Sequence, residues 1–154
     1  MFLNANSLII YSHLRSIFMY NHTTQIRVRY SETDRMNYVY YGNYAQYFEV
    51  ARVEALRNLG ISYKELEEAE GVMLPVLDYQ IKFFKPGFYD ELLTINTSIV
   101  KMPEARICFE YDMFNEKNVL INKASTTLVF VNKATGKPMP APANFLKLLQ
   151  PYFN

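Results

Sequence analysis

The sequence predicts one α+β domain in which an antiparallel sheet wraps around a long central helix. Apolar residues recur with a helical period from about residue 43 to residue 59, and four later segments alternate apolar and polar residues as half-buried strands do. The 154 residues, half of them apolar, are enough for one sizeable core. Since only the long helix has a broad apolar face, the sheet is expected to bury its own apolar face against that helix.

The first strand and the helices follow from patterns in the first half of the chain. Residues 25–30 alternate apolar and polar side chains, which predicts a strand. Residues 43–59 form the long helix, and Gly60 suits the left-handed residue that often follows a helix. Ser62 and Glu65 have the spacing of a capping box, so a shorter helix is expected to begin there. The apolar face of the long helix carries Tyr44, Tyr47, Phe48, Ala51, Ala55 and Leu59.

The second half of the chain predicts consecutive strands and a final short helix. The strands are expected at about 77–83, 93–99, 106–113 and 119–132, and the helix near 145–149. Their short turns indicate an antiparallel sheet, which leaves exposed edges. Pairing of two edge strands across a two-fold axis would cover one edge, so a homodimer or a dimer of dimers is expected.

The first residues of the chain stand apart from this pattern. We expect residues 1–19 to form an N-terminal extension and residues 20–154 to form the domain. The apolar stretch has neither the basic start nor the clear cleavage site of a signal peptide, and it is too short to span a membrane. A loosely attached extension, a start placed too early before Met19, and a short helix packed on the domain remain open.

Charge and cysteine usage exclude several classes of partner. Sixteen basic and fifteen acidic residues leave a formal charge of +1 without long runs of either sign, which argues against nucleic acid or a polybasic membrane patch. The single cysteine, Cys108, cannot form an internal disulfide, and no zinc ligand set is present. A reducing, cytoplasmic location without a bound metal is therefore expected.

The residue inventory also excludes several kinds of catalysis. His13 and His22, the two histidines, are expected upstream of the domain proper, so a catalytic triad is improbable. Cys108 is expected to be a small buried residue within a strand rather than a nucleophile. The five glycines are too scattered for a dinucleotide or phosphate loop, and no cofactor is expected. Carboxylates, hydroxyls, tyrosines and backbone dipoles remain for any enzyme.

Two segments resemble a known family. Residues 30–52, YSETDRMNYVYYGNYAQYFEVAR, are similar to the signature of the 4-hydroxybenzoyl-CoA thioesterase family of hotdog proteins. Residues 75–95, PVLDYQIKFFKPGFYDELLTI, resemble the strand, proline turn and following strand of the same family. The resemblance implies a hotdog fold and an enzyme that hydrolyses acyl-CoA to a carboxylic acid and free CoA, with coenzyme A only as part of the substrate.

Carried over residue by residue, the resemblance implies a catalytic carboxylate at Asp34 and a helix that opens at Asn43 and Tyr44. Tyr41 stands where many relatives have histidine, and its main-chain N–H, helped by Gly42, is implied to donate to the thioester oxygen. Elementary chemistry agrees with this scheme. A carboxylate in a loop can attack the carbonyl or activate water, while a helix N-terminus offers free N–H groups.

The same residues have structural interpretations, which stay open. Asp34 can form an Asx-turn, and Glu49 can pair with Arg52 on the long helix. A tyrosine cluster can line an acyl pocket or belong to the core or a dimer interface. Lysines near turns can meet the phosphates of CoA or simply face solvent. The tyrosines are Tyr38, Tyr40, Tyr41 and Tyr44, and the lysines are Lys82, Lys85, Lys133 and Lys137.

Three other functions compete with acyl-CoA hydrolysis. A thioesterase acting on acyl carrier protein would use the same residues and a basic docking patch. A non-catalytic hotdog dimer that binds acyl thioesters would keep the fold without the activity. A dehydratase is disfavoured, since in hotdog relatives that chemistry resembles a histidine with a carboxylate, and no histidine is expected in the domain.

Overall fold

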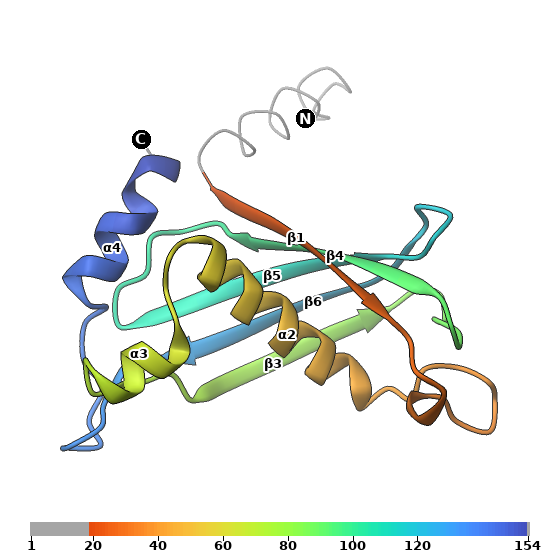
Figure 1. Ribbon diagram of the computed structural model, residues 1–154, viewed down its shortest axis with the longest axis horizontal. Helices are drawn as coiled ribbons and strands as arrows, with labels where there is room; N and C mark the ends of the chain where they lie inside the picture. The colour runs from red at the N-terminus through yellow and green to blue at the C-terminus, as the bar shows by residue number, and fades with distance from the viewer. Residues whose placement is uncertain (1–18, 154) are drawn as a thin grey trace, which may run out of the picture.

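The computed structural model describes residues 19–153. Its helices are η1 (Tyr30–Glu32), α2 (Asn43–Asn58), α3 (Tyr63–Glu68), α4 (Ala143–Leu149) and η2 (Gln150–Tyr152). Its strands are β1 (Tyr20–Arg27), β2 (Val72–Met73), β3 (Val76–Phe83), β4 (Leu92–Ile99), β5 (Arg106–Phe114), β6 (Leu120–Val129) and β7 (Val131–Asn132). Figure 1 shows α2 lying across one face of the main sheet.

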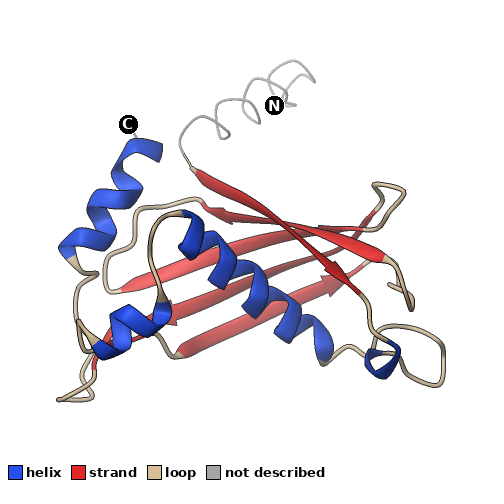
Figure 2. Ribbon diagram, viewed as in Figure 1, coloured by secondary structure: helices blue, strands red, loops and turns tan. Residues whose placement is uncertain are grey.

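The main sheet has five strands in the order β1-β4-β5-β6-β3. All four neighbouring pairs are antiparallel. The sheet curves around α2, and α3 and α4 lie at the end of the molecule where α2 finishes (Figure 2). The predicted α+β class, with an antiparallel sheet around a long helix, is confirmed. Within residues 19–153 no helix is long and apolar enough to span a membrane.

The core lies between α2 and the inner face of the sheet. In β5 every second residue is buried, from Ile107 to Met113, and the residues between them point to the other face. Phe48 of α2 is fully buried, and its ring stacks on Tyr111 of β5 at a centroid distance of 4.5 Å. Burial of a side chain of this size contributes roughly 1.5–3 kcal/mol, so α2 and the central strands stabilise each other.

The end of α2 and the start of α3 agree with the sequence prediction. Gly60, which follows α2, has a φ of 84°, a left-handed conformation that favours glycine. Ser62 is the N-cap of α3, and its Oγ accepts a hydrogen bond from the Glu65 N–H at 3.5 Å. This bond satisfies one of the free N–H groups at the start of α3.

The predicted bounds of the first strand are wrong at both ends. β1 begins at Tyr20 and pairs with β4 along its whole length, from Tyr20 opposite Ile99 to Arg27 opposite Leu92. Val28 leaves the strand, and its N–H donates to the Glu91 carbonyl. The residues that follow Tyr20 in β1 are polar on both faces, so no alternation of apolar and polar residues marks them as a strand. Main-chain pairing with β4 gives them strand structure.

The expectation that both histidines precede the domain is wrong for His22. His22 lies within β1, and its Nδ1 is 3.2 Å from the Thr24 hydroxyl. His13 lies outside the described residues. Because the ring of His22 contacts a neighbour on its own strand, its position gives no support to a catalytic triad.

We expect that a chain starting at Met19 keeps nearly unchanged its oligomeric state and the acyl-CoA hydrolysis that its sequence resemblance implies. Residues 1–18 lie outside the described residues, and the shortened chain keeps Tyr20, whose hydroxyl donates to the Ala55 carbonyl at 2.6 Å. Melting temperature, oligomer size and turnover of the two chains test this. A large drop in melting temperature, or a different oligomer size, would show that the removed segment packs on the domain.

Candidate functional site

The loop between η1 and α2 folds into a compact turn that carries Asp34. The Asp34 N–H donates to the Tyr38 carbonyl at 2.8 Å, and the Asn37 N–H donates to the Asp34 carbonyl at 2.9 Å. Asn37 has a φ of 64°, a left-handed conformation that asparagine tolerates better than most residues. Thr33 and Val39 then pair as a β-bridge that closes the turn. The main chain therefore fixes the position of Asp34 within this loop.

The two carboxylate oxygens of Asp34 have different surroundings. Oδ1 accepts hydrogen bonds from the N–H groups of Met36 at 2.8 Å and Tyr38 at 3.3 Å, as in an Asx-turn. Oδ2 has no hydrogen-bond partner among residues 19–153. The Asx-turn interpretation of Asp34 is therefore confirmed for Oδ1, while the catalytic role stays a prediction that Oδ2 is free to serve.

The start of α2 supplies N–H groups beside this carboxylate. The Tyr40 N–H donates to the Glu32 carbonyl and the Asn43 N–H donates to the Tyr40 carbonyl, both at 2.9 Å. The N–H groups between them, of Tyr41 and Gly42, have no hydrogen-bond partner within the described range. Gly42 is the N-cap of α2 and has no side chain to cap it. Free donors and the positive end of the helix dipole therefore meet at Tyr41 and Gly42.

A cavity of about 340 Å³ connects these features. Asp34 and Lys85 are the charged residues of its lining, and the rest is mostly apolar. A hollow of similar size, about 350 Å³, lies over polar side chains such as Gln80, and it contains neither Asp34 nor Tyr41. The chemistry therefore points to the first cavity. Its lining comprises Asp34, Met36, Tyr38, Val39, Tyr41, Tyr44, Phe83, Phe84, Lys85 and Pro86.

Tyr44 places a buried hydroxyl at this cavity. The hydroxyl accepts a hydrogen bond from the Gly87 N–H at 3.2 Å. Burial raises the pKa of Tyr44, with smaller contributions from the charges of Glu91 and Asp34, against the lowering effect of the Gly87 hydrogen bond. The phenol is therefore protonated at neutral pH. A Cβ on Gly87 would lie 3.2 Å from that oxygen, so glycine permits this close approach.

The turn between β3 and β4 forms the opposite wall of the cavity. Its Gly87 carbonyl accepts a hydrogen bond from the Val39 N–H at 2.9 Å. Tyr38 and Phe88 form a β-bridge, and their rings meet edge to face at 5.6 Å. The Phe88 N–H donates to the Glu91 carboxylate at 2.9 Å. The turn and the Asp34 loop are thus joined directly.

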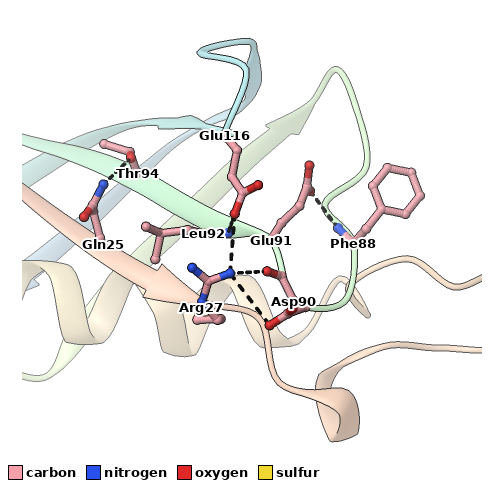
Figure 3. Close-up of polar contacts among 8 residues, drawn as sticks. All are labelled: Gln25, Arg27, Phe88, Asp90, Glu91, Leu92, Thr94 and Glu116. Carbon is pink, nitrogen blue, oxygen red and sulfur yellow. Dashed lines mark hydrogen bonds and ion pairs between the residues drawn. The ribbon is translucent and has the colours of Figure 1, made fainter.

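A polar cluster around Arg27 holds the far end of this turn (Figure 3). The Arg27 guanidinium donates to the Asp90 carbonyl and lies 3.4 Å from a Glu116 carboxylate oxygen. The same Glu116 oxygen accepts the Leu92 N–H at 2.8 Å. These charged side chains are about half exposed or more, so the ion pairs add little stability. Their effect is to tie the turn to β1 and to the hairpin between β5 and β6.

Comparison with known proteins decides the family. A family model described as the thioesterase superfamily matches residues 36–122, which include most of the cavity lining. The chain belongs to the thioesterase superfamily. The acyl-CoA thioester hydrolase YbgC of Escherichia coli O6:H1 is 31% identical over 121 residues, which cover 79% of this chain and 90% of that protein.

Solved structures agree with this family. The DHNA-CoA thioesterase of Staphylococcus aureus is similar with a TM-score of 0.74 and 38% identity, covering 78% of this chain and 80% of that one. A 4-hydroxybenzoyl-CoA thioesterase in complex with 4-hydroxybenzoyl-CoA shares the fold, with a TM-score of 0.77, 19% identity, and coverage of 84% and 99%. The resemblance to hotdog thioesterases is confirmed.

Of the site residues expected from the sequence, this thioesterase brings Asp34, Tyr41, Tyr44 and Lys85 to one cavity. The other three lie beside the cavity without lining it. The Asn43 side chain donates to the Glu32 carbonyl at 2.7 Å, so it supports the start of the helix. The ring of Tyr40 lies 4.6 Å from that of Tyr41, and a Cβ on Gly42 would come within 2.8 Å of the Tyr40 ring.

The remaining candidates do not line the cavity. Lys82, Lys133 and Lys137 do not line it. Glu49 is 3.9 Å from Arg52, as its structural interpretation predicts. Cys108 was expected to be buried, which is wrong: it is exposed, because it lies on the outward side of β5. Partial desolvation raises the pKa of the Cys108 thiol, so it is protonated at neutral pH and a poor nucleophile.

Sequence reasoning missed the contribution of Glu32. This carboxylate is only 6% exposed, although glutamate is rarely buried. It contacts Arg29 and Tyr47. A glutamate two residues before Asp34 carries no local pattern that indicates burial, because its partner Tyr47 lies in the second turn of α2.

Proposed function

We propose that the protein hydrolyses acyl-CoA thioesters to a carboxylic acid and free CoA at the cavity that Asp34 lines. One observation supports this most strongly. Asp34 and Tyr41 line the same cavity, and within residues 19–153 the Asp34 Oδ2 and the N–H groups of Tyr41 and its neighbour Gly42 have no hydrogen-bond partner. Membership of the thioesterase superfamily and similarity to the acyl-CoA thioester hydrolase YbgC support the same reaction.

The proposed reaction divides between these groups. The N–H groups of Tyr41 and Gly42 donate to the thioester oxygen and stabilise the negative charge that develops on it. The Asp34 carboxylate either attacks the carbonyl carbon, giving an anhydride that water then hydrolyses, or removes a proton from an attacking water. In both routes the carbon–sulfur bond breaks and CoA leaves as a thiolate, so no strong general acid is required.

The lining suggests where the two halves of the substrate bind. Tyr44 and Phe83, with ring centroids 5.4 Å apart, offer apolar surface to the acyl group. Lys85 is exposed at the cavity and provides a charge for the phosphates of CoA. No cofactor besides the substrate is required by this scheme. We propose a cytoplasmic enzyme, since acyl-CoA is an intracellular metabolite class and Cys108 is a free thiol.

The free edge of β3 supports a homodimer. Among residues 19–153, β3 pairs with β6 on one side only, and its residues are exposed or half-buried along the whole strand. Val76 and Leu77 are 51% and 54% exposed. An uncovered edge with apolar residues favours pairing with another strand, and a second copy of β3 is the economical partner.

Release of free thiol from a panel of acyl-CoA thioesters tests the proposed function. We expect turnover with at least one aromatic or medium-length acyl-CoA. The same acyl groups on acyl carrier protein form the second arm, and faster turnover there would favour a carrier-protein thioesterase. Binding of acyl-CoA without thiol release would favour a non-catalytic hotdog dimer and contradict the proposal.

We expect Tyr41→Phe to reduce kcat by less than about tenfold, because the proposed donor at this position is the main-chain N–H. The ring packs against Tyr40, and phenylalanine keeps this contact. Steady-state kinetics on the best acyl-CoA measure the effect beside Asp34→Asn. If Tyr41→Phe is as inactive as Asp34→Asn, the phenol itself takes part and the main-chain account is wrong.

A further inference from the structure

Glu32 has a buried and fully hydrogen-bonded carboxylate next to the site. Its Oε2 accepts the Tyr47 hydroxyl at 2.7 Å and the Arg29 N–H at 2.8 Å. Its Oε1 accepts the Arg29 Nε–H at 2.8 Å. Glu32 does not line the cavity, so its carboxylate has no route to the substrate. A different role must explain why a charged group is buried there.

The main chain of Glu32 joins the two ends of the Asp34 loop. Its carbonyl accepts the Tyr40 N–H at 2.9 Å and the Asn43 side-chain N–H at 2.7 Å. Asp34 follows Glu32 by two residues, and Tyr41 follows Tyr40 directly. The Asp34 carboxylate and the Tyr41 N–H, which are proposed to act on the thioester, therefore both lie close in the chain to the hydrogen bonds of Glu32.

The side chain extends this hold to α2. The Asn43 side chain donates to the Glu32 carbonyl, and Tyr47, one helical turn later on α2, donates to the Glu32 carboxylate. A single residue thus holds the first two turns of α2 to the Asp34 loop. Without these bonds the loop could shift relative to the helix, and the distance between Asp34 and the Tyr41 N–H would no longer be fixed.

Arg29 balances the charge of Glu32. Burial alone would raise the pKa of Glu32, but hydrogen bonds from Tyr47 and from the main chain and guanidinium of Arg29 outweigh it, and the pKa is lowered. Glu32 is therefore ionised at neutral pH. Because the folded pKa is the lower one, this stabilisation is present above the unfolded pKa and is lost as pH falls through the folded pKa.

We propose that Glu32 is a positioning residue, which holds the Asp34 carboxylate and the Tyr41 N–H at the separation that thioester hydrolysis needs. The inference rests on the proposed function and adds a residue that acts only through others. A misplacement of about 1 Å between reacting groups can reduce the rate roughly 100-fold, so loss of this hold should appear in kcat.

Glu32→Gln and Tyr47→Phe test the role. Glutamine has nearly the same shape but places an NH₂ group against the donors of Arg29 or Tyr47. We expect kcat to fall about 10- to 100-fold in Glu32→Gln and about 3- to 10-fold in Tyr47→Phe, with KM within about threefold of the wild type. The split between kcat and KM separates positioning from general damage to the fold.

Glu54→Gln is the matched control. Glu54 also pairs with an arginine, Arg57, but it lies in a later turn of α2 and does not line the cavity. We expect its kcat and KM to equal those of the wild type. Wild-type kcat in a folded Glu32→Gln protein overturns the inference, as does a rise in KM that matches the fall in kcat.

Two further outcomes are decisive. If Glu32→Gln does not fold, Tyr47→Phe decides, and wild-type kcat in that variant overturns the positioning role. A wild-type protein that releases no thiol from any acyl-CoA contradicts the proposed function and the positioning role with it. Normal wild-type turnover with unaffected variants contradicts the positioning role alone.

Discussion

Asp34→Asn is expected to lower kcat for acyl-CoA hydrolysis by at least about 100-fold while the protein stays folded. Asparagine keeps an oxygen at the position of Oδ1, which can still accept the Met36 and Tyr38 N–H groups. It replaces Oδ2 by an NH₂ group, which can neither attack a carbonyl nor accept a proton from water. The substitution thus removes the reacting carboxylate oxygen and keeps the hydrogen bonds that hold the loop.

Kinetics and thermal melting of three variants separate these roles. Asp34→Ala removes both oxygens, so it should lose activity and also melt at a lower temperature than Asp34→Asn. Asp112→Asn is the matched control, since Asp112 pairs with Lys123 at 3.0 Å and does not line the cavity. Full turnover by a well-folded Asp34→Asn protein would rule out Asp34 as the reacting carboxylate.

The fold was predictable where local pattern and tertiary burial agree. The expected long helix starts at Asn43, as α2 does, because its apolar spacing matches the face that packs on the sheet. β1 shows the opposite case. Its first residues after Tyr20 are polar, and pairing with β4, more than seventy residues away in the chain, gives them strand structure.

The site was predictable only in part, for a similar reason. Asp34 and Tyr44 stand in a segment whose order along the chain resembles a known family. The side chain of Glu32 is one methylene longer than that of Asp34, and the sequence does not indicate that the two carboxylates have different roles. The hydrogen bond from Tyr47, a residue of α2, shows that Glu32 is part of the packing. The distinction between a reacting carboxylate and a supporting one lies in the packing of α2 against the loop, which the order of residues does not specify.

β3 shows a further limit of sequence reasoning. Its apolar alternation correctly predicts a strand, yet the part of the chain that the structure describes covers the strand only in part. Tyr79 packs partly on Phe48 at a centroid distance of 6.2 Å and is still 37% exposed. An apolar pattern indicates that one face of a strand is buried. It does not indicate whether the residues that bury it belong to the same chain or, as we propose, to a second copy.

Leu77→Asp is expected to convert the proposed homodimer into a monomer and to reduce turnover at least about tenfold. A two-fold interface places the same residue on both copies, so one substitution brings two carboxylates to the contact. Leu77 lies at the irregularity between Val76 and Asp78, where β3 has no partner residue in β6. The folded single chain should therefore tolerate the change, and the cost should fall on association.

Val119→Asp is the matched control for Leu77→Asp, because Val119 is an exposed apolar residue, 41% accessible, in the turn before β6. Light scattering after size-exclusion chromatography gives the mass, and acyl-CoA turnover at the same concentrations gives the activity. We expect Val119→Asp to match the wild type in both. A dimer that persists in Leu77→Asp would show that the β3 edge is not the interface; a fully active monomer would show that one copy holds the complete site.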